Sequence, residues 1–66
     1  MMDVLKLKVS ITEKGLTQSK VAKQIGVSPQ AFSAKLKRGV FGSDEIEKMV
    51  RILELKNPVS IFFATK

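Results

Sequence analysis

The stretch from residue 17 to residue 38, TQSKVAKQIGVSPQAFSAKLKR, carries the densest set of structural signals in the chain. Thr17 suits a helix start, because its hydroxyl can accept a hydrogen bond from an N–H group that the first turn leaves unpaired. Gly26 stands where a left-handed residue would end that helix. The first half of the stretch therefore predicts a short helix over residues 18–25. Its apolar face consists of Val21, Ala22 and Ile25.

The second half of the stretch repeats these signals. Ser28 can cap a helix, and Pro29 at the first helical position loses nothing by lacking an N–H group. Phe32 and Leu36 are four residues apart and share a face. This half predicts a second helix over residues 29–37. Two short helices, a tight glycine turn and apolar residues on the facing sides are typical of a helix-turn-helix.

The stretch resembles the helix-turn-helix of the lambdoid phage repressor and Cro (XRE-like) family. The pattern is Gln18-x-x-x-Ala22-x-x-x-Gly26-Val27-Ser28, with Phe32 fourteen residues after Gln18. The rest of the chain is similar to the small phage-encoded regulators of that superfamily, and the match covers about residues 7 to 63. The resemblance implies an all-α, compact five-helix lambda-repressor-like domain with the helix-turn-helix as helices 2 and 3. The further matching segments are EKGLTQ (13–18), FSAKL (32–36) and IFF (61–63).

Residues 3–14 fit two structures. Leu5, Leu7, Val9 and Ile11 alternate with polar residues, which is a strand pattern, whereas Val4, Leu7 and Ile11 also form a helical stripe. No turn residue interrupts the segment before Gly15, and the resemblance favours a helix. We expect a helix over residues 3–14, with an N-terminal strand as the alternative.

The remainder of the chain predicts two more helices. Residues 44–54 have acidic residues in the first turn, where they complement the helix dipole, and a core-facing apolar stripe. Asn57 and Pro58 signal the start of a short helix over residues 58–64, with Asn57 as its cap. Between residues 39 and 42 we expect a loop, and the whole chain 1–66 forms one domain. The stripe consists of Ile46, Met49, Val50 and Leu53.

The composition excludes several kinds of site. The chain has no Cys and no His, so disulfides and the thiolate or imidazole chemistry of zinc sites are absent. We therefore expect no metal and no cofactor, and no small-molecule ligand. No apolar run approaches the roughly 20 residues of a membrane-spanning helix, and the first residues lack the layout of a signal peptide. These features predict a soluble cytoplasmic protein with no membrane partner.

The positive charge is concentrated in one part of the sequence. The net charge is +6, and residues 1–40 hold eight Lys and Arg against two acidic residues. Residues 41–66 hold four of each sign. A basic half that contains the helix-turn-helix favours a polyanion as partner. Charge alone does not decide, because Lys is also an ordinary solvated surface residue.

On a helical wheel, the side of helix 29–37 opposite Phe32 and Leu36 would meet DNA bases in a major groove. The predicted base-reading residues are Gln30, Ser33, Ala34 and Lys37. The predicted phosphate-binding residues are Thr17, Gln18, Ser19, Lys20, Lys35 and Arg38. The resemblance also implies that Gln18 braces Gln30 across the turn.

Helix 58–64 is apolar on all sides, which is unusual for a terminal surface helix. We expect part of it to seal the core and part to form a homodimer interface, and which residue does which stays open. The predicted interface residues are Val59, Ile61, Phe62 and Phe63. The sequence thus predicts a homodimeric transcription regulator, a Cro-like phage repressor, that binds a near-palindromic operator in double-stranded DNA.

Other classes of function fit the sequence less well. An enzyme is not expected, because no His, Cys or Tyr is present as base or nucleophile. A protein-interaction module, antitoxin-like or an anti-repressor, is the alternative, because one fold serves many functions. A basic helix on a membrane surface fits poorly, because the core already needs the apolar face of helix 3–14.

Overall fold

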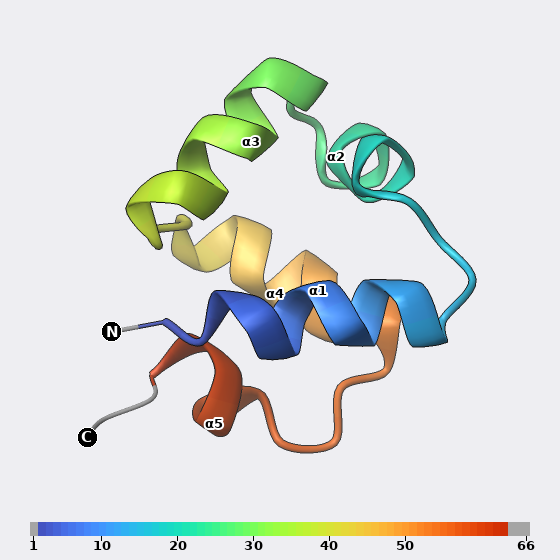
Figure 1. Cartoon of the computed structure of the whole chain (residues 1–66), viewed down its shortest axis with the longest axis vertical. Coiled ribbons are helices and arrows are strands. Elements are labelled where there is room, and N and C mark those ends of the chain that lie inside the picture. Colours follow the sequence, from blue (N-terminus) through green and yellow to red (C-terminus); the bar gives the residue numbers. More distant parts are fainter. Residues whose placement is uncertain (1, 64–66) are drawn as a thin grey trace.

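The computed structural model describes residues 2–63 and contains five helices and no strand over that range (Figure 1). The predicted all-helical class is therefore confirmed, and the helix bounds differ from those predicted by at most two residues. Residue 64, which the sequence placed in the last helix, lies outside the described residues. The helices are α1 (Val4–Glu13), α2 (Gln18–Ile25), α3 (Pro29–Arg38), α4 (Ser43–Leu53) and α5 (Pro58–Phe62).

Three helix starts are capped by side chains. Asp3 Oδ1 accepts from the N–H of Lys6 at 3.1 Å. Two predicted caps are confirmed: Thr17 Oγ1 accepts from Lys20 N–H at 3.2 Å, and Ser28 Oγ accepts from Ala31 N–H at 3.1 Å. Each bond satisfies a donor that the first turn leaves unpaired.

The cap predicted for α5 is wrong in its detail. The Asn57 side chain makes no capping hydrogen bond. Its backbone carbonyl instead accepts from the hydroxyl of Ser60 at 2.9 Å and from the Ser60 N–H at 3.2 Å. Pro58 occupies the first helical position as predicted.

The turn between α2 and α3 depends on Gly26. Its φ of 86° lies in the left-handed region, which glycine adopts without the steric cost that a Cβ imposes. The next N–H group, of Val27, donates to the carbonyl of Ala22 at 3.0 Å and closes the end of α2. Ser28 then starts α3 at once, so that the two helices lie in contact.

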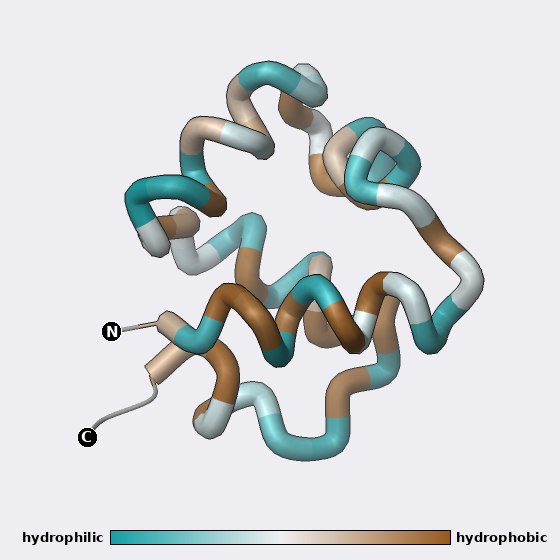
Figure 2. Tube along the Cα trace, in the orientation of Figure 1, coloured by the Kyte–Doolittle hydropathy of each residue, from teal (hydrophilic) through white to brown (hydrophobic). Residues whose placement is uncertain are grey.

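The core is entirely apolar within residues 2–63, where no polar or charged residue is buried. Phe32 of α3 lies at its centre, and its ring centroid is 5.3 Å from that of Phe41. Phe41 comes from the predicted loop between α3 and α4, so this loop contributes a side chain to the core. From α4, Met49 and Leu53 are buried, which confirms that its stripe faces inward. Figure 2 shows that apolar residues recur along the helices and alternate with polar ones.

The choice between strand and helix for the first segment is settled in favour of a helix. Leu7 and Ile11 of α1 are buried, whereas Leu5 is 71% exposed and Val9 is 47% exposed. The alternating pattern arises because α1 has apolar residues on two faces, and only one of them covers the core.

The predicted dimer interface is wrong for two of its four residues, because they are buried within one chain. Ile61 and Phe62 are each only 6% exposed, so they belong to the core of a single chain. The N–H of Asp3 donates to the carbonyl of Ile61 at 2.6 Å, which ties the start of α1 to α5. Val59 and Phe63 are exposed and are the members of the predicted interface that another molecule can contact.

The helices lie around this core with α3 and α5 on opposite sides of the domain (Figure 1). The first helix and α4 lie between them. Within residues 2–63, no helix combines the length and the apolar content needed to cross a lipid bilayer.

Candidate nucleic-acid interface

The outer face of α3 is the candidate interface. Phe32 and Leu36 anchor one side of the helix in the core. The four side chains predicted to read bases lie on the other side, and all four residues are exposed. This face offers an amide, a hydroxyl, a methyl group and an ammonium group within two and a half turns of helix. The four are Gln30, Ser33, Ala34 and Lys37.

The beginning of α2 supplies a second group of predicted residues. Thr17, Gln18, Ser19 and Lys20 are all exposed. The hydroxyl of Thr17 already accepts from the Lys20 N–H, so it is committed to the cap. The N–H groups at the start of a helix have no partner within the helix, and with the dipole they favour an anion.

The end of α3 is basic. Lys37 and Arg38 are exposed, and Gly39 follows them as the left-handed residue at which the helix ends. Positive side chains in a last turn also interact favourably with the negative end of the helix dipole. These two residues are therefore available to a polyanion without loss of an internal ion pair among the described residues.

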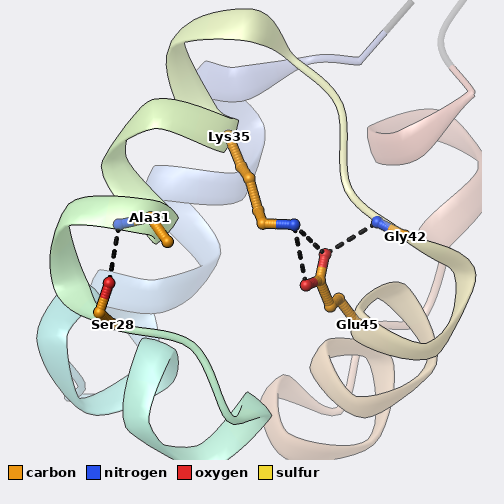
Figure 3. Close-up of polar contacts among 5 residues, drawn as sticks. All are labelled: Ser28, Ala31, Lys35, Gly42 and Glu45. Carbon is orange, nitrogen blue, oxygen red and sulfur yellow. Dashed lines mark hydrogen bonds and ion pairs between the residues drawn. The ribbon is translucent and has the colours of Figure 1, made fainter.

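Lys35 differs from the other predicted phosphate ligands. Its Nζ lies 3.1 Å from Glu45 Oε1 and 2.9 Å from Glu45 Oε2, and both side chains are largely covered (Figure 3). The ammonium group is held against α4, so the prediction that Lys35 binds phosphate does not fit its position. Its role in the described fold is to join α3 to α4.

Glu45 is a residue that the sequence reasoning missed. Its Oε1 also accepts from the N–H of Gly42 at 2.8 Å, so one carboxylate ties together α3, the preceding loop and α4 (Figure 3). The hydrogen bond from the Gly42 N–H is the main cause of the lowered pKa of Glu45; partial burial opposes it, and the Lys35 ammonium lowers the pKa further. The available signal was a Glu at the third position of a helix, from where it can reach back to the cap.

The side chains of this region are hydrogen-bonding and positively charged groups. No group of three or more acidic residues within residues 2–63 is arranged to hold a metal ion. The residues brought to the surface of α3 are donors and acceptors of hydrogen bonds, with cations at the C-terminal end. Such a surface suits a polar, negatively charged partner.

Comparison with known proteins adds no relative. No family model matches the chain, and neither a curated protein sequence nor a solved structure is similar enough to count as a match. The functional assignment therefore rests on the residues themselves.

Proposed function

We propose that the protein is a sequence-specific DNA-binding transcription regulator in which α2 and α3 act as a helix-turn-helix and α3 reads the major groove. The observation that carries the proposal is the outer face of α3, which is polar and basic while its opposite side is anchored by Phe32 and Leu36. A helix that packs against the core on one side and exposes hydrogen-bonding groups on the other suits insertion into the major groove.

Each exposed side chain of α3 has a matching base chemistry. Gln30 can bond to adenine N6 and N7 at the same time, and Lys37 can donate to guanine O6 or N7. Ala34 can contact the methyl group of thymine, and Ser33 can donate or accept. Each good base contact contributes roughly 1–3 kcal/mol of discrimination against a wrong base.

Phosphate contacts would set the position of the domain on the duplex. The exposed N-terminus of α2 and the side chains of Lys20 and Arg38 are the groups we assign to this role. Each phosphate neutralised releases condensed counterions, so binding by this basic domain should weaken steeply with added salt.

The proposal concerns what one domain does on DNA. A dimer that reads a near-palindromic operator must present two α3 helices on one side, about 34 Å apart. The helix α5, which carries the exposed Val59 and ends just before the exposed Phe63, lies across the domain from α3 (Figure 1). An interface there directs the two α3 helices away from each other, so we assign operator reading to each domain singly.

The test is DNA binding by wild type, Gln30→Ala and Gln24→Ala. The probes are DNA fragments from around the gene of this protein and unrelated DNA, at two salt concentrations. Gln24 lies exposed on α2 outside the predicted site, so the same substitution there is the matched control. The proposal predicts a fragment-selective, salt-sensitive complex that Gln30→Ala weakens about tenfold or more and Gln24→Ala leaves unchanged.

Two other results would contradict the proposal. Salt-sensitive binding without fragment preference, unchanged by Gln30→Ala, would indicate a nonspecific DNA-binding protein. Absence of any complex at low salt would exclude DNA as the partner and leave the protein-interaction module as the remaining interpretation.

A further inference from the structure

The three cations in the last turn of α3 differ in their surroundings. Lys37 and Arg38 are exposed and make no ion pair with another described residue. The Lys35 side chain is only 28% exposed, and its ammonium lies 3.1 and 2.9 Å from the two carboxylate oxygens of Glu45. One of the three positive charges is therefore already neutralised within the fold, and two are available to a partner.

Lys35 lies close to the edge of α3 that we assign to phosphate contacts. It precedes Arg38 by three residues, so the two side chains are about 60° apart around the helix and about 4.5 Å apart along its axis. The four-carbon stem of a lysine is flexible, so an unpaired ammonium at position 35 can reach the same edge as Arg38. In the folded chain, the Lys35 side chain instead extends to the carboxylate on α4 (Figure 3).

The carboxylate of Glu45 is held in place by a second contact. Its Oε1 accepts from the Gly42 N–H at 2.8 Å, and the Glu45 side chain is only 17% exposed. Because the pair is partly covered, solvent and salt screen its attraction less than at an open surface. The two other ion pairs of the described residues have carboxylate side chains that are 75% and 72% exposed. The contact with Glu45 is therefore the one best suited to hold an ammonium group back from a polyanion.

We propose that Glu45 is a specificity-determining residue for DNA binding, because it withholds the Lys35 ammonium from DNA phosphates. The inference rests on the proposed function of α3. Phosphate contacts carry no sequence information, so a third free cation on this edge would strengthen binding to unrelated DNA. With Lys35 paired, binding depends more on the base-reading face of α3.

Release of Lys35 should also lower the preference for the correct sequence. On that sequence, base contacts fix the position of α3 in the groove, so Lys35 can use only a phosphate that this position offers. On unrelated DNA no base contact fixes the helix, and α3 can shift until Lys35 reaches a phosphate. Unrelated DNA therefore gains more affinity than the preferred fragment.

The test is DNA binding by wild type and Glu45→Gln over a salt series, on the fragment that wild type prefers and on unrelated DNA. The amide of Glu45→Gln still offers an acceptor to the Gly42 N–H, but it has no charge to hold Lys35. We expect a several-fold higher affinity for unrelated DNA and a smaller preference for the selected fragment. The slope of the logarithm of the binding constant against the logarithm of salt concentration should steepen by about 1.

Two further variants separate the released ammonium from other causes. Glu47→Gln makes the same change of net charge on the same helix, but Glu47 is exposed and forms no ion pair with Lys35. It should leave the salt slope at the wild-type value. The double variant Lys35→Met, Glu45→Gln removes the released ammonium and should return both the slope and the affinity for unrelated DNA to wild-type values.

Three results would overturn the inference. They are an unchanged affinity of Glu45→Gln for unrelated DNA, an equal increase in Glu47→Gln, and an increase that persists in the double variant. Circular dichroism of each variant checks that it is folded, so that a changed affinity is not the result of unfolding.

Lysine acetylation followed by mass spectrometry tests the pairing without DNA. In wild type, the paired and partly covered Lys35 should react more slowly than the exposed Lys37. In Glu45→Gln the rate at Lys35 should rise towards that at Lys37, and the rate at Lys37 should not change. Equal rates at the two lysines in wild type would overturn the inference, whatever the DNA measurements give.

The two measurements also separate this inference from the proposed function. A wild-type protein that binds no DNA would overturn the proposed function and the specificity role with it, while acetylation would still decide whether Glu45 holds Lys35. Fragment-selective binding by wild type, with the same salt slope and the same preference in Glu45→Gln, would overturn only the role of Glu45.

Discussion

Lys35 of α3 and Glu45 of α4 form the best covered ion pair of the described residues, with the ammonium 3.1 and 2.9 Å from the two carboxylate oxygens. The carboxylate also accepts from Gly42 N–H at 2.8 Å. The orientation of α3 relative to α4 is thus fixed by a charged group as well as by the packing of Phe32 on Phe41.

The first prediction concerns Glu45→Gln. The amide can still accept from the Gly42 N–H, but it loses the attraction to Lys35, so we expect unfolding free energy to fall by about 1 kcal/mol at neutral pH. Because folding lowers the pKa of Glu45, its stabilisation is complete above the ordinary Glu value of about 4.3 and is lost as pH falls through the lowered pKa. Urea unfolding of wild type and variant at pH 7 and at acid pH measures both the loss of unfolding free energy and its dependence on pH.

Glu47→Gln serves as its control, because Glu47 is exposed and its contact with Arg51 is 3.9 Å long. That variant should change the unfolding free energy by less than about 0.5 kcal/mol. A difference between wild type and Glu45→Gln that stayed the same at both pH values would contradict the assigned role of the carboxylate.

The second prediction separates Lys35 from the DNA-facing cations. The double variant Lys35→Met, Glu45→Gln removes one charge of each sign from a pair that is already neutral. We expect the slope of the logarithm of the DNA-binding constant against the logarithm of salt concentration to stay at the wild-type value. Lys37→Ala should reduce the slope by about 1 if it contacts a phosphate, and should relax preference at one base if it reads guanine. A slope reduced by the double variant would restore Lys35 as a phosphate ligand.

The third prediction compares two glycines. Gly26→Ala meets no atom within 4 Å, but its φ of +86° strains any residue with a Cβ, so we expect a loss of about 1 kcal/mol or more. Gly42 has an ordinary φ of −70°, and an added Cβ there would lie 3.5 Å from Glu45 Oε1. Gly42→Ala should change stability by less than about 0.5 kcal/mol, because reduced chain entropy offsets a poorer cap. Thermal unfolding of both variants checks the contrast, which equal losses would contradict.

The fourth prediction compares two adjacent phenylalanines. Phe62 is 6% exposed and Phe63 is 60% exposed. Phe62→Ala should lower the unfolding free energy by about 3–5 kcal/mol, because it leaves a cavity in the core. Phe63→Ala, measured at a concentration too low for self-association, should change it by less than about 1 kcal/mol. Urea unfolding of both variants is the measurement, and a larger loss for Phe63→Ala would reverse our assignment.

Much of the helical layout could be predicted because its signals are local. Thr17, Ser28 and Pro29 act within one turn of their own positions, and Gly26 acts through its own backbone. Such residues need no knowledge of distant neighbours. The exposed face of α3 could also be predicted, because helical periodicity places it opposite the buried Phe32.

The features that could not be predicted depend on contacts between distant residues. Lys35 and Glu45 are ten positions apart, and only the packing of α3 on α4 brings them together. Similarly, the sequence does not tell which apolar residues of α1 face the core. Leu5 and Val9 are as apolar as Leu7, and only the packing of α1 in the folded chain shows that Leu7 is buried while Leu5 and Val9 are exposed.

The opposite placement of α3 and α5 lets two surfaces change independently. The outer face of α3 shares no residue with the hollow lined by Leu5, Val9, Leu53 and Ile61 on the other side, so substitutions that alter one need not compensate for the other. The helix α4 contacts both, since Glu45 near its start holds Lys35 and Leu53 at its end lines the hollow. Variation on the two sides is therefore free, whereas variation along α4 is constrained from both ends.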